Sequence, residues 1–217
     1  FIGGAKDQPG SIFIQDIRGT FVESKQPALV ENKTSEDAAS VFFDADGDGD
    51  QDLYVCSGST DFSSASPALK DRLYFNDGTG AFKNSGQQLP IRGYESTSCV
   101  RASDFDQDGD TDLFVGTRVK ISRYGYPVNG YLLRNDGKGN FTISKAIYAS
   151  PTELNTNVNC GYYHNQLYDL NNDGKTDIII AGSGVWINNG GRAFTLNNTM
   201  LQNSYFTACA VIKETTS

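Results

Sequence analysis

The sequence predicts an all-β fold, a β-propeller of four-stranded blades, and three observations support this prediction. An acidic motif begins at residues 44, 104 and 169, so that it recurs three times along the 217-residue chain. A hairpin motif follows each copy, and no helical periodicity of useful length occurs. Each period then holds about four short strands, and four-stranded units that repeat radially are typical of β-propellers.

The repeats divide one expected domain, residues 1–217, into consecutive units. We expect an incomplete first unit at about 1–35, full units at 36–95, 96–158 and 159–202, and a closing strand at 203–213. The first residues, Phe1-Ile-Gly-Gly, match the strand that follows an acidic loop, and residues 206–212 resemble the strand that precedes one. The terminal strand would therefore complete the first blade of a closed four-bladed ring, which we favour because an open arc exposes sheet edges. The alternative is a part of a larger propeller.

Short segments rich in β-branched and aromatic residues flank the acidic motifs and predict strands. Ala39–Phe43 and Leu53–Cys56 enclose the first motif, and Leu113–Gly116 and Ile178–Ala181 follow the other two. Each acidic motif should therefore be a loop between two neighbouring strands of one blade.

The second motif of each unit predicts a β-hairpin. Residues 73–82 and 132–141 carry Asn-Asp-Gly between β-rich flanks, residues 185–194 carry Asn-Asn-Gly, and residues 12–21 are a degenerate copy. Asn and Gly adopt the positive φ angles that tight hairpin turns require.

The acidic loops have the residue pattern of a calcium site. Counted from the first aspartate, positions 1, 3, 5 and 9 offer side-chain oxygens, position 7 offers a backbone carbonyl and position 6 is glycine, as in the first nine positions of an EF-hand. Position 12 is apolar and strands flank the loop, so these are hairpin loops rather than EF-hands. The predicted site residues are Asp44, Asp46, Asp48, Asp50 and Asp52; Asp104, Asp106, Asp108, Asp110 and Asp112; and Asp169, Asn171, Asp173, Lys175 and Asp177.

Hard oxygen ligands favour Ca²⁺ over zinc and copper, and Mg²⁺ prefers to keep most of its waters. We therefore expect up to three Ca²⁺ ions. The third loop should bind most weakly, because Asn171 and Lys175 reduce its negative charge.

The overall charge agrees with cations as partners. The net charge is −8 and the pI about 4.6, which argues against nucleic acid. Close aspartates without a counter-ion would repel each other by roughly 1 kcal/mol per pair even in water. We also expect no membrane span, since no apolar run approaches the required length of about 18 residues.

These motifs resemble FG-GAP/VCBS repeats, the blades of the integrin α-subunit N-terminal propeller and of many bacterial surface proteins. Asp-x-Asp-x-Asp-Gly-x-x-Asp-Leu resembles the calcium loop of that family, and residues 112–118 and 131–141 are similar to the bacterial ASPIC/UnbV-associated group. The Phe-Gly signature is absent, so ligand recognition of the integrin type is not implied. The resemblance implies a calcium-stabilised, exported or surface-exposed propeller that serves in adhesion or recognition.

The sequence favours a non-enzymatic role. The lone histidine, His164, is expected to be structural, and nothing around Cys160 supports a Cys–His nucleophile. The four cysteines could be buried thiols or could form one or two disulfides. Calcium outside cells is millimolar, which suits loops that lack a twelfth-position glutamate, so we expect an extracellular, periplasmic or cell-surface location.

Two long segments between strands, Ser57–Arg72 and Arg118–Tyr131, are candidate recognition loops at a propeller rim. Tyr124, Tyr126 and Tyr131 could stack on sugar rings or protein side chains, or else cover a blade edge. The basic residues Arg118, Lys120 and Arg123 are expected in an ordinary solvated loop. The partner would be a protein, as in adhesion, or a carbohydrate, as in a lectin; a purely structural module of a larger surface protein is the third alternative.

Overall fold

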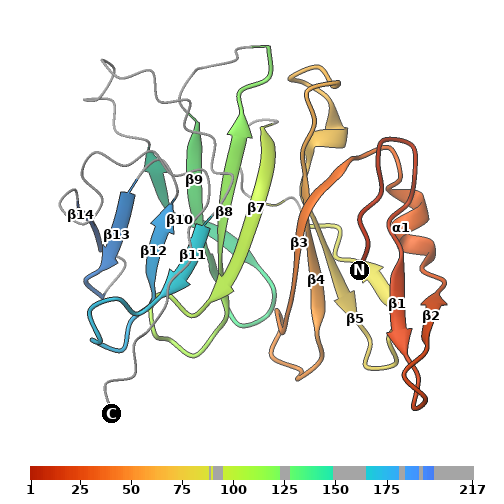
Figure 1. Cartoon of the computed structure of the whole chain (residues 1–217), viewed down its shortest axis with the longest axis horizontal. Helices are drawn as coiled ribbons and strands as arrows, with labels where there is room; N and C mark the ends of the chain where they lie inside the picture. Colours follow the sequence, from red (N-terminus) through yellow and green to blue (C-terminus); the bar gives the residue numbers. More distant parts are fainter. Residues whose placement is uncertain are drawn as a thin grey trace.

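The computed structural model describes residues 1–87, 89, 95–122, 128–148, 165–180, 184–190 and 193–197. Three four-stranded sheets and one two-stranded sheet follow one another in chain order across the molecule (Figure 1). The strands are β1 (Ile12–Gln15), β2 (Phe21–Ser24), β3 (Asp37–Phe43), β4 (Asp52–Ser57), β5 (Arg72–Asn76), β6 (Phe82–Asn84), β7 (Ser96–Ser103), β8 (Asp112–Val119), β9 (Asn129–Asn135), β10 (Phe141–Tyr148), β11 (Asn165–Tyr168), β12 (Asp177–Ile180), β13 (Gly184–Asn188) and β14 (Phe194–Asn197).

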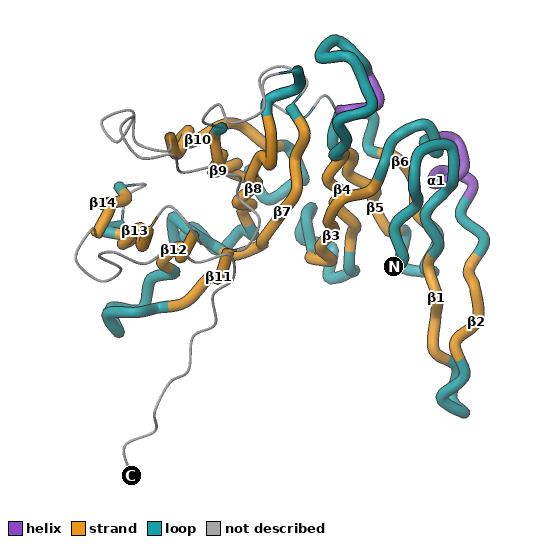
Figure 2. Tube along the Cα trace, turned by 45° about the horizontal axis from the view of Figure 1, so that its top comes forward, coloured by secondary structure: helices purple, strands orange, loops and turns teal. Residues whose placement is uncertain are grey.

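Each four-stranded sheet is an antiparallel meander in which consecutive strands are neighbours. The orders are β3-β4-β5-β6, β7-β8-β9-β10 and β11-β12-β13-β14. This is the blade topology that the repeats predict, so the predicted fold class, a blade-like β-propeller architecture, is confirmed. Figure 2 shows the sheets succeeding one another as separate blades, and the described residues form no closed ring. The expected closing strand at 203–213 lies outside the described residues.

The first unit is a partial blade. Strands β1 and β2 form the hairpin predicted at residues 12–21, and Ile2 forms an antiparallel bridge with Ser11, just before β1. Ile2 thus occupies the place that the second strand takes in the other sheets.

The core consists of three apolar clusters, each between two successive sheets. Leu53, Val55 and Tyr74 of the second sheet pack on Ile12 and Leu29 of the first unit. The other two clusters repeat this arrangement one blade further along; one includes Phe43, Tyr54, Leu73, Leu113 and Leu133, and the other includes Phe105, Phe114, Leu132, Ile178 and Phe194. Blade faces therefore stabilise one another through the hydrophobic effect.

Two short helical segments were not predicted from the sequence. They are α1 (Pro27–Glu31) and the 3₁₀ helix η1 (Pro67–Leu69), and each starts with a proline, whose fixed φ suits the first helical position. One turn is too short to leave a periodic pattern in the sequence. In the described part of the chain, no helix has the length and apolar character needed to cross a membrane.

The cysteine alternatives are settled for two of the four residues. Cys56 and Cys99 are buried thiols that belong to different apolar clusters, and neither forms a disulfide. Cys160, Cys209 and His164 lie outside the described residues.

Candidate metal centre

The three acidic loops join the first two strands of each four-stranded sheet and lie along the same edge of the molecule, at the bottom of Figure 1. The antiparallel register fixes where each loop opens and closes. The residue before position 1 pairs with position 9 in every case, as Phe43 with Asp52, Ser103 with Asp112 and Tyr168 with Asp177.

The first aspartate of each loop organises the turn by accepting backbone hydrogen bonds. The Oδ1 and Oδ2 atoms of Asp44 accept from Gly47 N at 2.8 Å and Gly49 N at 3.0 Å. In the other two loops the position-6 amide is bound in the same way, Gly109 by Asp104 at 3.0 Å and Gly174 by Asp169 at 2.9 Å. The common framework confirms that the three motifs fold alike.

Two positions of each loop adopt a left-handed backbone, whereas the sequence pointed only to position 6. The position-6 glycines have φ values of 91°, 96° and 80°, and the position-4 residues Gly47, Gln107 and Asn172 have φ values of 78°, 61° and 57°. Gly47 and Asn172 at position 4 are residue types that favour the left-handed conformation, so the sequence could have predicted it there. Gln107 gives no such indication, because glutamine has no special preference for this conformation.

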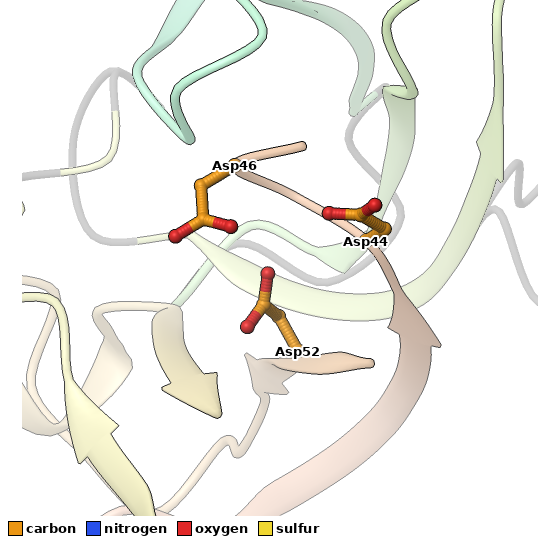
Figure 3. A group of neighbouring side chains, drawn as sticks. All are labelled: Asp44, Asp46 and Asp52. Carbon is orange, nitrogen blue, oxygen red and sulfur yellow. The ribbon is translucent and has the colours of Figure 1, made fainter. Parts of the chain in front are cut away.

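In the first loop, three carboxylates converge without a cationic side chain among them. Asp44, Asp46 and Asp52 each offer an oxygen within 4.8 Å of the others, and Figure 3 shows the three side chains pointing toward one another. Burial raises the pKa of Asp46, and the negative charges of Asp48 and Asp44 raise it further. The arrangement could hold a cation through hard oxygen donors.

The second loop brings a different trio together, with a cation beside it. Asp104, Asp106 and Asp108 offer oxygens within 4.8 Å of one another. Arg134 of β9 contacts two of them: its Nη2 donates to Asp108 Oδ2 at 2.7 Å, and its Nε lies 3.0 Å from Asp106 Oδ2. The hydrogen bond from Arg134 lowers the pKa of Asp108.

The third loop has the same backbone but less negative charge. Lys175 Nζ donates to Asp173 Oδ2 at 2.7 Å, which lowers the pKa of Asp173, and Asn171 Nδ2 donates to the same oxygen at 3.1 Å. Over the described ranges, groups of three acidic side chains with oxygens this close occur only in the first two loops.

The position-7 side chains lie against the hairpin turn of their own blade. Asp50 and Asp110 lie against the turn glycines Gly78 and Gly137, where a Cβ would meet their carboxylate oxygens at 2.8 Å and 2.6 Å. Lys175 similarly lies against Gly190. The backbone carbonyl of position 7 as a metal ligand stays a prediction.

The aspartate at position 9 has a structural role that the sequence did not reveal. Asp52 is fully buried, with Oδ2 accepting from Ala45 N and Oδ1 from Asn76 N, both at 2.8 Å. Asp112 and Asp177 make the same pair of bonds in their own blades. Burial raises the pKa of Asp112 to about 6. Each of these carboxylates joins an acidic loop to the hairpin of its own sheet.

In the second and third complete blades, a hairpin asparagine joins neighbouring blades. Asn135 Nδ2 donates to Ala45 O of the preceding blade at 2.7 Å and to Thr111 O of its own blade at 3.1 Å. Asn188 repeats this arrangement with Phe105 O at 3.0 Å and Thr176 O at 3.2 Å. The sequence identified these asparagines only as turn residues.

The structure describes only some of the candidate recognition residues, and the tyrosine among them is buried. Tyr131 is only 3% exposed, and its hydroxyl donates to Glu95 Oε2 at 2.7 Å, so its ring belongs to the core between two blades. The expectation that Tyr131 would stack on a ligand is wrong, because strand β9 points this side chain inward. Arg118 and Lys120 are exposed, whereas Arg123, Tyr124 and Tyr126 lie outside the described residues.

Four-stranded meanders whose first connection is a repeated acidic loop define a propeller-type repeat protein. Comparison with protein families agrees: residues 57–115 match the FG-GAP-like repeat. The matched segment runs from the end of β4 through the second acidic loop into β8, so this part of the chain carries the FG-GAP-like repeat that the motifs predict. The finer likeness to the VCBS and ASPIC/UnbV groups stays a prediction, and none of the curated proteins compared with the chain matches it.

Proposed function

We propose that this chain is a calcium-binding, non-enzymatic propeller module that acts in adhesion or recognition outside the cell. The observation that carries the proposal is the repetition of one acidic loop on one edge of three blades, with the same backbone hydrogen bonds each time. In the first loop Asp44, Asp46 and Asp52 would hold the ion, and in the second Asp104, Asp106 and Asp108. The third loop would bind more weakly.

Calcium fits the donor set better than other common cations do. All candidate ligands are carboxylate, amide or carbonyl oxygens, and the flexible geometry of Ca²⁺ tolerates a mixed set of this kind. Bound calcium would supply the positive charge that the crowded carboxylates of the first loop lack. It would thereby stiffen the edge at which Asn135 and Asn188 join neighbouring blades.

Calcium binding is tested by metal analysis and thermal unfolding. Protein stripped with EDTA and dialysed against 1 mM CaCl₂, a concentration of extracellular order, should retain calcium and unfold at a higher temperature than the stripped protein. MgCl₂ at equal concentration is the control. The variants Asp46→Asn and Asp106→Asn should each lower the calcium content. Calcium-independent unfolding together with no bound metal would reject the proposal.

The partner is a separate part of the proposal. The segment between β4 and β5, residues 58–71, lies at the opposite edge of the molecule from the acidic loops (Figure 1) and includes the exposed or half-exposed polar residues Ser59, Thr60 and Ser63. We favour a protein ligand at this edge. Matrix proteins and a glycan array, probed with calcium and with EDTA, distinguish adhesion from a lectin-like function. Binding to neither would favour a structural module.

A further inference from the structure

One hairpin position differs sharply among the three complete blades. It is the residue immediately before the hairpin asparagine that recurs in each blade: Phe75 in the first of these blades, Arg134 in the second and Ile187 in the third. Because the three hairpins share the same register to their acidic loops, this position lies near the loop of its own blade each time. Only the second blade places a charged side chain there.

Arg134 lies against two of the three carboxylates that could hold a cation in the second loop. It contacts Asp106 and Asp108, at positions 3 and 5, over the distances of 3.0 Å and 2.7 Å given above. Its side chain is 38% exposed, and together with Asp106 and Asp112 it lines a small pocket between the second and third complete blades. A guanidinium in this position neutralises about one of the negative charges of the loop.

In the part of the chain that the structure describes, the first loop has no such counter-ion. Among the described residues, none of the ion pairs involves Asp44, Asp46, Asp48, Asp50 or Asp52. Phe75 instead packs on the next blade, where its ring would lie 2.6 Å from a Cβ added to Gly139. Two loops with identical sets of five aspartates therefore have different electrostatic surroundings.

We propose that Arg134 is a resident counter-ion of the second loop that calcium must displace, so that the first loop fills at lower calcium concentrations than the second. This inference rests on the proposed calcium function. Calcium and the guanidinium hinder each other at the carboxylates of Asp106 and Asp108, because the two cations repel each other at this short range and compete for the same two carboxylates. Without calcium, Arg134 holds the second loop against β9, whereas the first loop has no comparable tether.

Backbone amide spectra can follow each loop separately. The amides of Gly49 and Gly109 donate to the first aspartate of their loops, so their ¹H–¹⁵N resonances report on the two sites. In a calcium titration of the full chain, Gly49 should respond first. In Arg134→Gln, Gly109 should respond at roughly ten-fold lower calcium, as expected for the loss of the two ion pairs of Arg134. Gly49 should be unchanged, and Arg134→Lys should behave almost like the wild type.

Lys138→Gln is the matched control, because it removes one positive charge from the same hairpin at an exposed residue that forms no ion pair with the loop. If Arg134→Gln moves the Gly109 response no more than Lys138→Gln does, the proposal is wrong, while a Gly49 response would still support calcium binding. If neither glycine responds in the wild type, the calcium function itself fails.

A metal-free measurement tests the tether independently. In EDTA, amide hydrogen exchange over residues 104–112 should be slower than over residues 44–52, and Arg134→Gln should abolish the difference. Equal exchange of both loops in the wild type would overturn the proposal whatever the calcium titration shows.

Discussion

Carboxylates gather at both ends of the first complete blade, β3 to β6. The protein's own groups neutralise or bind the carboxylates at one end but not at the other. At one end, Asp44 and Asp46 of the first acidic loop face each other without a cationic side chain. At the other end, Asp71 is buried and accepts hydrogen bonds from Ser57 N at 2.8 Å, Tyr54 Oη at 2.8 Å and Thr97 Oγ1 at 2.5 Å.

A second carboxylate at the Asp71 end, that of Asp37, also has partners within the protein for both of its oxygens. Asp37 forms an ion pair with Arg72 at 2.7 Å and accepts from Gly4 N of the first unit at 2.7 Å. This end therefore joins three successive units with the protein's own groups. The comparison shows that at one end of the blade the protein supplies the partners of its carboxylates. At the acidic end the carboxylates are instead arranged so that an added cation could bind them.

The largest expected effect tests the bond between blades at the acidic end. Asn135→Leu removes two buried donor contacts, including the one to Ala45 O of the preceding blade, and leaves both carbonyls without this donor. Urea unfolding should show a loss of about 3 kcal/mol, in the range for unsatisfied buried polar groups. Asn76→Leu is the control and should lose clearly less, because the hydrogen bonds of the Asn76 side chain, to Gln51 O and from Gly80 N, stay within its own blade. Equal losses would mean that the inter-blade bond contributes little.

The pH dependence of Asp71 tests the opposite end. Burial raises the pKa of Asp71 to about 6, although Thr97, Ser57, Tyr54 and Arg72 act to lower it. The folded pKa therefore exceeds the unfolded value of 3.8, so the folded state binds this proton more tightly. As the pH rises from about 4 to about 6, the contribution of Asp71 to stability should fall by an amount on the order of 2–3 kcal/mol.

The direct measurement is the ¹³C carboxyl shift of Asp71 as a function of pH. A midpoint near pH 6 is expected, and a midpoint near pH 4 would show that the three hydrogen bonds outweigh burial. Asp77, an exposed aspartate whose pKa is lowered by its bonds to Thr79, provides an internal reference in the same spectra.

A smaller effect is expected from Thr97→Val, which keeps the shape of the side chain but removes the hydroxyl that joins β7 to Asp71. The hydroxyl also donates to Ser57 O, so the loss of this shared buried donor should destabilise the fold by about 1–2 kcal/mol. It should also raise the pKa of Asp71 further, because the Thr97 hydrogen bond lowers it. Thr79→Val, in an exposed turn, is the matched control and should change stability by less than about 0.5 kcal/mol. A Thr97 variant as stable as this control would show that Asp71 does not depend on β7.

The fold was largely predictable because its repeats are local. Motifs such as Asn76-Asp-Gly determine a hairpin within a few residues, and the aspartates of each loop bind amides two to five residues away. The contacts that link a loop to other strands and blades are not local: Arg134 reaches Asp108 across 26 residues, and Asn135 reaches Ala45 across 90. A pattern within one repeat cannot reveal such partners, because they depend on how strands and blades align. Tyr131 was misassigned for the same reason, since only the packing of β9 shows that it faces inward.

The smallest effect concerns the backbone of the acidic loop itself. Gly49 has a φ of 91°, and a Cβ added there would meet no atom within 4 Å, so Gly49→Ala introduces backbone strain without a steric clash. The expected loss is about 1 kcal/mol in urea unfolding. Gly139→Ala is the contrasting variant, because its Cβ would lie 2.6 Å from the Phe75 ring of the neighbouring blade and should add a packing penalty. If calcium stiffens this edge, the deficit of Gly49→Ala should grow in calcium, since the strained loop then also binds the ion less tightly. If Gly49→Ala loses the same free energy of unfolding in calcium and in EDTA, the conformation of this loop does not affect ion binding.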